Sequence, residues 1–326
     1  MHDRHGRNAG DAVMHLAVTV SAAHAARWMP LFTAAFPGAR IDAREPGSPV
    51  RSAMPPADFV VMVDPCATVF DEQPTPRAIF TASAGVGHVL RLPNLPAGVP
   101  LVRLEDGGMA LPMIRYVLAV VLGFAQGLPT YARQQRAGRW VKHPLRAPAD
   151  ITVGVLGLGI IGAAIARAVA AQGFAVRGFA QSHKAVEGVC CYAGAAGFEA
   201  FLAHTDVLVN VLPETAATTG LINRAAMRQL ADGAHIINIG RGNALVEGDL
   251  IDLLDAGKLG GATLDVFATE PLPPEHPYWQ RSDIAITPHV AGPTVPDATV
   301  AQIAAKLAQL ERGEAITGIV DVGREY

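Results

Sequence analysis

The chain has 326 residues, half of them apolar, and a formal net charge of −3 at pH 7. This length predicts two domains, and the slightly acidic balance without a basic run argues against a nucleic-acid-binding protein. The three cysteines, Cys66, Cys190 and Cys191, are too few for a disulfide framework, so we expect a cytoplasmic protein.

No stretch predicts a membrane span. The most apolar one, residues 116–125, is far shorter than the roughly 20 residues that a spanning helix needs. The polar N-terminus is expected to be a frayed tail rather than a signal peptide. Its His2 and His5 have no cysteine or acidic cluster nearby, so we expect no metal site.

The first segment alternates strand-like and helix-like stretches. An amphipathic helix is predicted at residues 23–36, and a proline-containing linker at residues 140–150. Between them, residues 109–136 have the pattern of one long helix, as a crossover between two domains would need. Apolar runs predict buried strands at residues 16–20, 59–63, 78–80 and 101–104.

From residue 151 onward the pattern is βαβ throughout. Residues 151–156 form a near-continuous apolar run, which is typical of a parallel strand covered on both faces. A final helix is predicted at residues 296–312. Further short strands are predicted at residues 175–180, 207–212, 235–239, 262–266 and 284–287. The alternation predicts an α/β fold with parallel sheets.

A glycine-rich turn, Gly157-Leu158-Gly159-Ile160-Ile161-Gly162, follows the first of these strands and opens a helix. This is the context in which such a turn binds a dinucleotide. Gly157 allows the tight turn, Gly159 lets the backbone approach a pyrophosphate, and Gly162 lets the helix pack closely on the strand. The alternative is a glycine-rich turn without a ligand.

The choice of cofactor is read at the tip of the next strand, where NAD enzymes place a carboxylate on the ribose 2′-hydroxyl. No carboxylate follows residues 175–180; the next residues include Ser182, His183 and Lys184. These three could hold a 2′-phosphate by hydrogen bond and charge. They therefore favour NADP over NAD, and the alternative is a solvated turn that tolerates either cofactor.

Three charged side chains lie at or soon after the carboxyl ends of predicted strands: Arg241, Glu270 and His289. An arginine can bind the carboxylate of a 2-oxo acid, and a histidine can protonate the alkoxide that forms on reduction. A glutamate can orient that histidine. Each residue alone could be a surface charge or a turn residue, but all three downstream of a dinucleotide turn predict a hydride-transfer enzyme.

The chain resembles the D-2-hydroxyacid dehydrogenases over nearly its whole length. The motifs that carry the resemblance are, after the glycine turn, Asn238-x-x-Arg241-Gly242, Leu264-Asp265-Val266-Phe267, Glu270-Pro271-Leu272-Pro273 and Pro288-His289-Val290-Ala291. Within the family, the chain is most similar to the bacterial glyoxylate/hydroxypyruvate reductases of the A type. The residues pointing there are Ala84-Gly85-Val86, Arg103-Leu104-Glu105-Asp106, Met109, Arg133-Gln134-Gln135, Trp140 and Trp279.

The resemblance implies two doubly wound parallel sheets, of Rossmann-like and flavodoxin-like type. A substrate domain of residues 1–105 and 291–326 would be interrupted by an inserted dinucleotide-binding domain of residues 106–290. A homodimer built largely from cofactor-domain surfaces would also be expected.

The resemblance also implies roles for single residues. Arg241 would bind the substrate carboxylate and carbonyl. His289 would donate the proton, and Glu270 would orient the His289 side chain. Gly85 and Val86 would bind the carboxylate through backbone amides. The cofactor would contact, besides the residues of the glycine turn, Leu212, Pro213 and Thr218 on its adenosine side, Ile239, and Asp265 near the nicotinamide carboxamide.

Several positions depart from the family pattern. Gly87 and His88 stand where relatives usually have an acidic residue, and Val63 and Asp64 stand where Trp and a basic residue are common. Gly240 replaces the usual alanine beside the arginine, and Arg115 occupies a position that is often acidic. These departures leave the substrate preference open.

We therefore expect an NADPH-preferring reductase of small 2-oxo acids such as glyoxylate and hydroxypyruvate, with D-2-hydroxy acids as chiral products. One alternative keeps the fold but takes a bulkier 2-oxo acid, for which Val63 leaves room, or phosphite. A second alternative is a nucleotide-sensing protein of the same fold, as in some transcriptional co-repressors.

Overall fold

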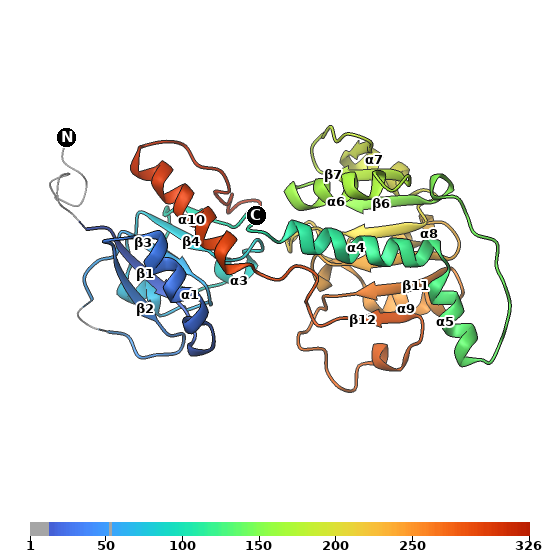
Figure 1. The fold of residues 1–326 in the computed structure, drawn as a ribbon, viewed down its shortest axis with the longest axis horizontal. Helices are drawn as coiled ribbons and strands as arrows, with labels where there is room; N and C mark the ends of the chain where they lie inside the picture. Colours follow the sequence, from blue (N-terminus) through green and yellow to red (C-terminus); the bar gives the residue numbers. More distant parts are fainter. Residues whose placement is uncertain (1–12, 52–53) are drawn as a thin grey trace. The chain divides into compact units, whose positions relative to one another are not determined.

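The computed structural model describes residues 13–51 and 54–326, so the N-terminal tail with His2 and His5 lies outside the described residues. The chain divides into two compact units (Figure 1). Unit 1 comprises Met1–Gly108 and Thr294–Tyr326, and unit 2 comprises Met109–Pro293. Unit 2 therefore interrupts unit 1 along the chain, and the predicted fold class with an inserted domain is confirmed.

Unit 1 is built on a parallel sheet with the order β2-β1-β3-β4-β5 in its described part. Because β2 and β3 flank β1 on opposite sides, the chain changes direction across the sheet between β1 and β3. Its elements are β1 (His15–Thr19), α1 (Ala22–Ala35), β2 (Arg40–Arg44), β3 (Phe59–Met62), α2 (Val69–Glu72), β4 (Ala78–Thr81), α3 (Gly87–Leu90), β5 (Leu101–Val102) and α10 (Pro296–Glu311).

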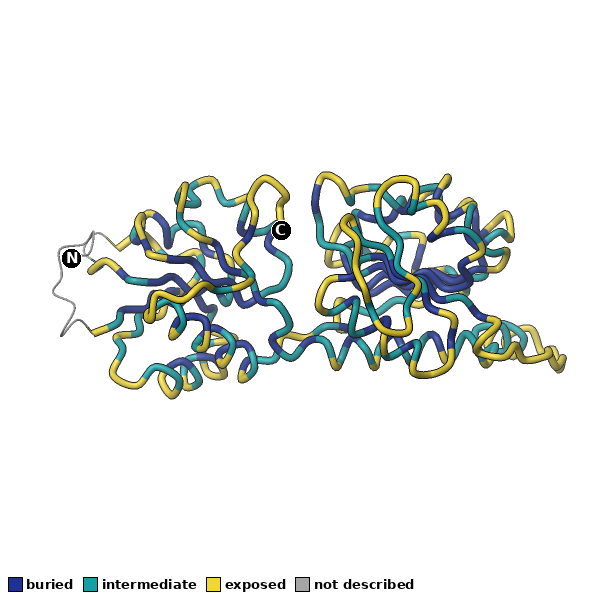
Figure 2. Tube along the Cα trace, turned by 90° about the horizontal axis from the view of Figure 1, so that it is seen from above, coloured by how far each residue is buried: buried dark blue, intermediate teal, exposed yellow. Residues whose placement is uncertain are grey.

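The central strands β1, β3 and β4 of the unit-1 sheet are buried on both faces. Figure 2 shows buried residues along the strands in the middle of each unit. One face packs against α1 and α10 through side chains such as Phe32 and Leu307. The other face packs against α2 and α3, to which Phe70 and Val89 belong. Burial on both faces explains why these strands are continuously apolar rather than alternating.

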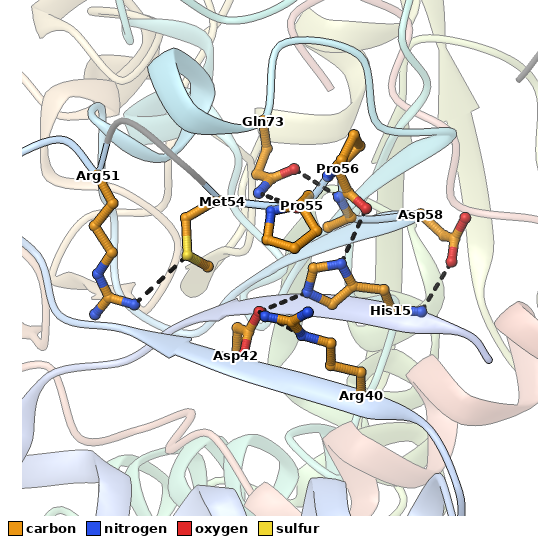
Figure 3. Close-up of polar contacts among 10 residues, drawn as sticks. His15, Arg40, Asp42, Arg51, Met54, Pro55, Pro56, Asp58 and Gln73 are labelled. Carbon is orange, nitrogen blue, oxygen red and sulfur yellow. Dashed lines mark hydrogen bonds and ion pairs between the residues drawn. The ribbon is translucent and has the colours of Figure 1, made fainter.

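A polar cluster joins β1, β2 and the segment before β3 (Figure 3). The imidazole of buried His15 lies with Nδ1 2.9 Å from the carbonyl oxygen of Pro56 and Nε2 2.7 Å from the carboxylate of Asp42. The backbone amide of His15 donates to the carboxylate of Asp58 at 2.8 Å. A carbonyl oxygen can only accept, so Nδ1 donates, and the buried ring is satisfied at both nitrogens.

Unit 2 is built on a second parallel sheet, with the order β12-β11-β10-β9-β6-β7-β8 and a change of direction between β6 and β9. Its elements are α4 (Ala110–Ala125), α5 (Leu128–Arg136), η1 (Pro148–Asp150), β6 (Thr152–Leu156), α6 (Ile160–Ala170), β7 (Ala175–Ala180), β8 (Cys190–Ala193), α7 (Gly194–Leu202), β9 (Val207–Asn210), α8 (Arg224–Gln229), β10 (Ala234–Asn238), η2 (Gly242–Ala244), α9 (Glu247–Asp255), β11 (Leu259–Leu264), η3 (Pro277–Gln280) and β12 (Ile284–Ile286).

The prediction of one long helix over residues 109–136 is wrong. The helix breaks between α4 and α5, whose axes differ in direction by 64°. Gly127 has a left-handed φ of 69°, and Pro129 stands in the first turn of α5, where its missing N–H leaves no hydrogen bond unmade. Within the described residues no single helix is long and apolar enough to cross a membrane; α4 and α5 meet that criterion only as a bent pair.

A buried histidine in unit 2 makes stability depend on pH. Burial lowers the pKa of His235 from 6.5 to about 4, and the positive charge of Arg133 acts in the same direction. As the pH falls through 6.5, the imidazole of His235 becomes protonated in the unfolded chain, whereas in the folded chain it stays neutral until about pH 4. The free energy of unfolding should therefore fall by about 3 kcal/mol across this window.

Urea unfolding at several pH values between 7 and 4 tests this expectation. The variant His235→Gln can still hydrogen bond to Thr263, which lies 2.9 Å from Nε2 of the histidine, but it does not titrate. The wild-type chain should lose more stability on acidification than the variant. Equal losses in the two proteins would show that His235 does not contribute.

Candidate active site

The glycine-rich turn lies between β6 and α6 at the carboxyl edge of the unit-2 sheet. Gly157 has a φ of 107°, which an L side chain rarely adopts. A Cβ at Gly162 would overlap the carbonyl oxygen of Gly157, so this glycine is required for packing. At Gly159, by contrast, an added Cβ would meet no protein atom within 4 Å. The fold itself does not require Gly159, and the open space beside it suits a pyrophosphate at the helix N-terminus.

Two asparagines that are fully buried hold the neighbouring strand ends. The side-chain amide of Asn210 donates to Oδ1 of Asn238 at 2.9 Å, and Oδ1 of Asn210 accepts the amide of Leu212 at 3.2 Å. The side-chain amide of Asn238 donates to the carbonyl oxygen of Arg241 at 3.1 Å. Asn210 therefore fixes the start of the loop that carries Leu212, Pro213 and Thr218, and the sequence reasoning missed it.

The other predicted cofactor residues occupy two environments. Ile239 is buried after β10, and the hydroxyl of Thr218 donates to the carbonyl oxygen of Pro213 at 2.7 Å. Ser182, His183 and Lys184 are exposed after β7, and no hydrogen bond or ion pair joins them to any described residue. Their polar groups are thus available to an external ligand.

Arg241 follows β10 and is largely withdrawn from water. Burial lowers the pKa of its guanidinium, while the negative charges of Glu214 and Glu270 act in the opposite direction. Its Nη1 donates to the carbonyl oxygen of Gly240 at 2.7 Å, which fixes one edge of the guanidinium. The sequence analysis did not identify Glu214, which provides a second negative charge, besides Glu270, that acts on Arg241.

The predicted pair of Glu270 and His289 comes together in space. Nδ1 of His289 lies 2.8 Å from Oε2 of Glu270, and Oε1 of Glu270 accepts the amide of Phe267 at 2.9 Å. Because a carboxylate accepts hydrogen bonds, we assign the donated proton to Nδ1 of His289. Nε2 then remains available to another partner. The side chain of His289 is 47% exposed, so Nε2 can reach a ligand.

Asp265, which is buried at the end of β11, holds the backbone on which His289 stands. Its carboxylate accepts the amides of Val290 and Ala291 at 2.8 and 2.9 Å and the hydroxyl of Thr287 at 2.6 Å. The carbonyl oxygen of Asp265 accepts the amide of His289 at 2.9 Å. These bonds fix His289 at a φ of 54°, which is uncommon for a residue other than glycine.

Gly85 and Val86 lie in unit 1, in the loop between β4 and α3. The carbonyl oxygen of Gly85 accepts the hydroxyl of Ser83 at 2.8 Å, which orients the loop. Within the described residues, neither the amide of Gly85 nor that of Val86 has an acceptor. Consecutive free amides form a site for an anion.

A close approach between two loops makes Gly242 sensitive to substitution. A Cβ at Gly242 would overlap the backbone of Phe267 and Ala268, just before Glu270. We expect Gly242→Ala to lower the free energy of unfolding by about 1–3 kcal/mol. It should also lower kcat/KM, because the loops carrying Arg241 and Glu270 must move apart.

The matched control for this substitution is Gly248→Ala in α9, where an added Cβ meets no protein atom within 4 Å. Urea unfolding and initial rates of both variants separate steric overlap from a general effect of replacing glycine. If Gly242→Ala behaves like Gly248→Ala in both measurements, the packing argument is wrong.

A dinucleotide turn, a partly buried arginine and a carboxylate-oriented histidine at the carboxyl edge of one parallel sheet define a dinucleotide-dependent oxidoreductase. Residues 118–291 match the family model of the D-isomer specific 2-hydroxyacid dehydrogenases, NAD binding domain. The chain belongs to this family, and the predicted class of enzyme, an NAD(P)-dependent 2-hydroxyacid dehydrogenase acting on 2-oxo acids, is confirmed.

Relatives and solved structures agree with this assignment. The chain is 38% identical over 304 residues to the glyoxylate/hydroxypyruvate reductase A of Serratia proteamaculans, covering 92% of this chain and 96% of that protein. A D-isomer specific 2-hydroxyacid dehydrogenase from Xanthobacter autotrophicus, in complex with NADPH and MES, superposes with a TM-score of 0.89 at 36% identity, covering 97% of this chain and all of that one. The NADPH-dependent glyoxylate/hydroxypyruvate reductase of Sinorhizobium meliloti, in complex with NADP and sulfate, gives 0.87 at 33% identity with the same coverage.

Among the described residues, no group of three or more His, Cys, Asp or Glu side chains is placed to hold a metal ion.

Proposed function

We propose that this protein is an NADPH-preferring reductase of small 2-oxo acids, including glyoxylate and hydroxypyruvate, that forms D-2-hydroxy acids where the product is chiral. The observation that carries the proposal is the 2.8 Å contact between Glu270 and His289 in the same unit as the partly buried Arg241. The relatives named for this activity are 33–38% identical to this chain and support the substrate class.

The three charged residues have separate tasks in the proposed reaction. Arg241 binds the carboxylate and carbonyl oxygen of the substrate through its planar fork. Bound NADPH supplies the hydride that reduces the carbonyl carbon. His289 delivers a proton from Nε2 to the forming alkoxide, and Glu270 aligns the ring through Nδ1 and stabilises its positive form. In unit 1, the free amides of Gly85 and Val86 are proposed to bind the substrate carboxylate as well.

The cofactor residues are proposed on the geometry of the turn and its neighbours. The amides of Gly159, Ile160 and Ile161 at the start of α6 bind the pyrophosphate, and Gly157 and Gly162 shape the turn. Leu212, Pro213 and Thr218 line the adenosine side, with Ile239 and Asp265 toward the nicotinamide. The preference for NADPH is supported by the unpartnered Ser182, His183 and Lys184 and by solved relatives in complex with NADPH or NADP.

We also propose a homodimer in the cytoplasm. Unit 2 exposes several large apolar side chains on α4, α5 and the segment after α5: Leu111, Leu122, Leu128, Trp140 and Leu145. Exposed apolar side chains of this size support an interface between subunits on this part of unit 2. The three cysteines are free, which fits a reducing compartment. Light scattering coupled to size-exclusion chromatography should give twice the mass of the 34.1 kDa chain.

Initial rates with NADPH and NADH against glyoxylate, hydroxypyruvate, pyruvate and phenylpyruvate test the proposed function, together with phosphite in the oxidative direction. We expect the highest kcat/KM with NADPH and either glyoxylate or hydroxypyruvate. Turnover of phosphite alone would refute the proposal, and so would the absence of turnover with every 2-oxo acid.

The loop after β7 carries a prediction about cofactor choice. Replacing Lys184 with Glu should lower the ratio of kcat/KM for NADPH to that for NADH by about tenfold or more, because a carboxylate repels the 2′-phosphate. The exposed Glu187 in the same loop supplies the matched control, Glu187→Lys. An unchanged ratio in Lys184→Glu would show that the loop does not read the 2′-phosphate.

A further inference from the structure

A cavity of about 280 Å³ opens in unit 1, at a place that none of the predicted site residues lines. His24, Arg27 and Trp28 of α1 line it, together with Val63 after β3 and Ala82 after β4. It therefore lies at the carboxyl edge of the sheet, beside the change of direction between β1 and β3. Open α/β sheets bind their ligands at this point.

The histidine of the cavity has a fixed orientation. Nδ1 of His24 lies 2.9 Å from Oδ1 of Asp64, and Oδ2 of Asp64 accepts the amide of Ser21 at 2.7 Å. Burial raises the pKa of Asp64, but hydrogen bonds from Ser21 and His24 outweigh it and lower the pKa overall. Asp64 is therefore a carboxylate near neutral pH and accepts the Nδ1 proton. Nε2 of His24 has no partner among the described residues.

The cavity also contains two unengaged donors. Arg27 makes no hydrogen bond or ion pair with any residue of the described ranges. The same holds for the indole N–H of Trp28, although only 5% of this residue is exposed. Buried tryptophans usually find an acceptor for this group. The guanidinium and the indole N–H of the cavity can both donate to an anionic acceptor, and the imidazole of His24 lines the cavity beside them.

The cavity adjoins the loop proposed to bind the substrate. Ala82, which lines the cavity, begins the segment that leads to Gly85 and Val86, and its amide donates to the carbonyl oxygen of Met62 at 2.8 Å. This bond ties together the ends of β3 and β4, which pair as neighbours about 4.8 Å apart. The cavity and the loop of Gly85 and Val86 therefore lie at the ends of adjacent strands of one sheet.

We propose that the cavity binds the distal carboxylate of a 2-oxo dicarboxylic acid, and that Arg27 is its specificity-determining residue. The inference rests on the proposed function and narrows its substrate class from 2-oxo acids to those with a second carboxylate. The cavity supplies donors to that carboxylate, and Val63 leaves the space that its carbon chain occupies.

Two matched substrate pairs test the proposal: 2-oxoglutarate against 2-oxovalerate, and oxaloacetate against 2-oxobutyrate. Within each pair only the distal carboxylate differs. The wild-type enzyme should favour the dicarboxylate in kcat/KM. Arg27→Met should lower kcat/KM for the dicarboxylates by about 10- to 100-fold, mainly through KM, because a charge-assisted bond is lost. Its kcat/KM for glyoxylate should stay within about twofold. The matched control is Arg312→Met, since Arg312 is also exposed but follows α10 at its far end.

The outcomes separate the inference from the function on which it rests. Turnover of glyoxylate without a preference for dicarboxylates would contradict the inference alone, and so would equal effects of Arg27→Met on both members of a pair. Absence of turnover with every 2-oxo acid would contradict the proposed function. Inhibition by succinate tests whether the cavity is instead a separate site for a free dianion. Succinate would then inhibit noncompetitively against glyoxylate, and Arg27→Met would abolish the inhibition; this result would overturn the inference.

Discussion

Replacing His289 with Asn should lower kcat for the reduction of glyoxylate by about 10²- to 10⁴-fold, the range that a general acid contributes. Asparagine is the suitable replacement because His289 has a φ of 54°, a conformation that asparagine tolerates well. The backbone bonds to Asp265 can therefore persist, while the proton donor is lost. Affinity for NADPH, measured by quenching of protein fluorescence, should change little.

The matched control is His204→Asn. His204 has nearly the same backbone conformation, with a φ of 57°, and is exposed in unit 2 away from Glu270. Its variant should keep wild-type turnover. A His289→Asn enzyme with unchanged kcat would remove the histidine from the chemistry and leave the proposed mechanism without a proton donor.

Replacing Arg241 with Lys should lower kcat/KM by about 100-fold. A lysine keeps the charge but lacks the planar fork, so one of two charge-assisted hydrogen bonds to the substrate is lost, and the ammonium must also be desolvated in a buried place. The loss should appear in both kcat and KM, since Arg241 is proposed to contact the carbonyl oxygen whose charge develops in the reaction.

The control for this substitution is Arg228→Lys on α8, an exposed arginine in the same unit. Steady-state rates of both variants with glyoxylate and hydroxypyruvate test whether Arg241 binds the substrate. If Arg241→Lys and Arg228→Lys are both indistinguishable from the wild type, Arg241 does not bind the substrate.

The sheets could be predicted because their strands are buried on both faces and therefore apolar throughout. Residues 59–63 and 151–156 are such runs, and β3 and β6 lie within one residue of them. The strands that escaped prediction lie at sheet edges. The sequence of β2 is Arg-Ile-Asp-Ala-Arg, and β8 contains Cys190 and Cys191. Most residues of these two edge strands are exposed or half-buried, so neither strand needs a continuous apolar run.

The helix break at Gly127 was missed for a different reason. The apolar pattern continues through it, while the turn depends on a single left-handed glycine and the proline that follows. An isolated glycine within a helical pattern is tolerated at a cost of about 1 kcal/mol relative to alanine, so it does not by itself predict the end of a helix.

In the active site, sequence order identified the charged groups but not what holds them. Glu270 and His289 are 19 positions apart, and their 2.8 Å contact exists only because the segments after β11 and β12 meet at one sheet edge. The supporting residues, Asn210 and Thr287, are small polar side chains that any loop could contain. Their role follows from burial and hydrogen bonding, neither of which a single sequence displays.

The most direct test of the central claim is the product formed from hydroxypyruvate and NADPH, with NADPH consumption followed by absorbance and the glycerate resolved by chiral chromatography. We predict that the wild-type enzyme forms one molecule of D-glycerate for each NADPH oxidised. In the same time, His289→Asn should oxidise almost no NADPH and form almost no glycerate. Formation of L-glycerate, or no oxidation of NADPH by the wild-type protein, would contradict the account.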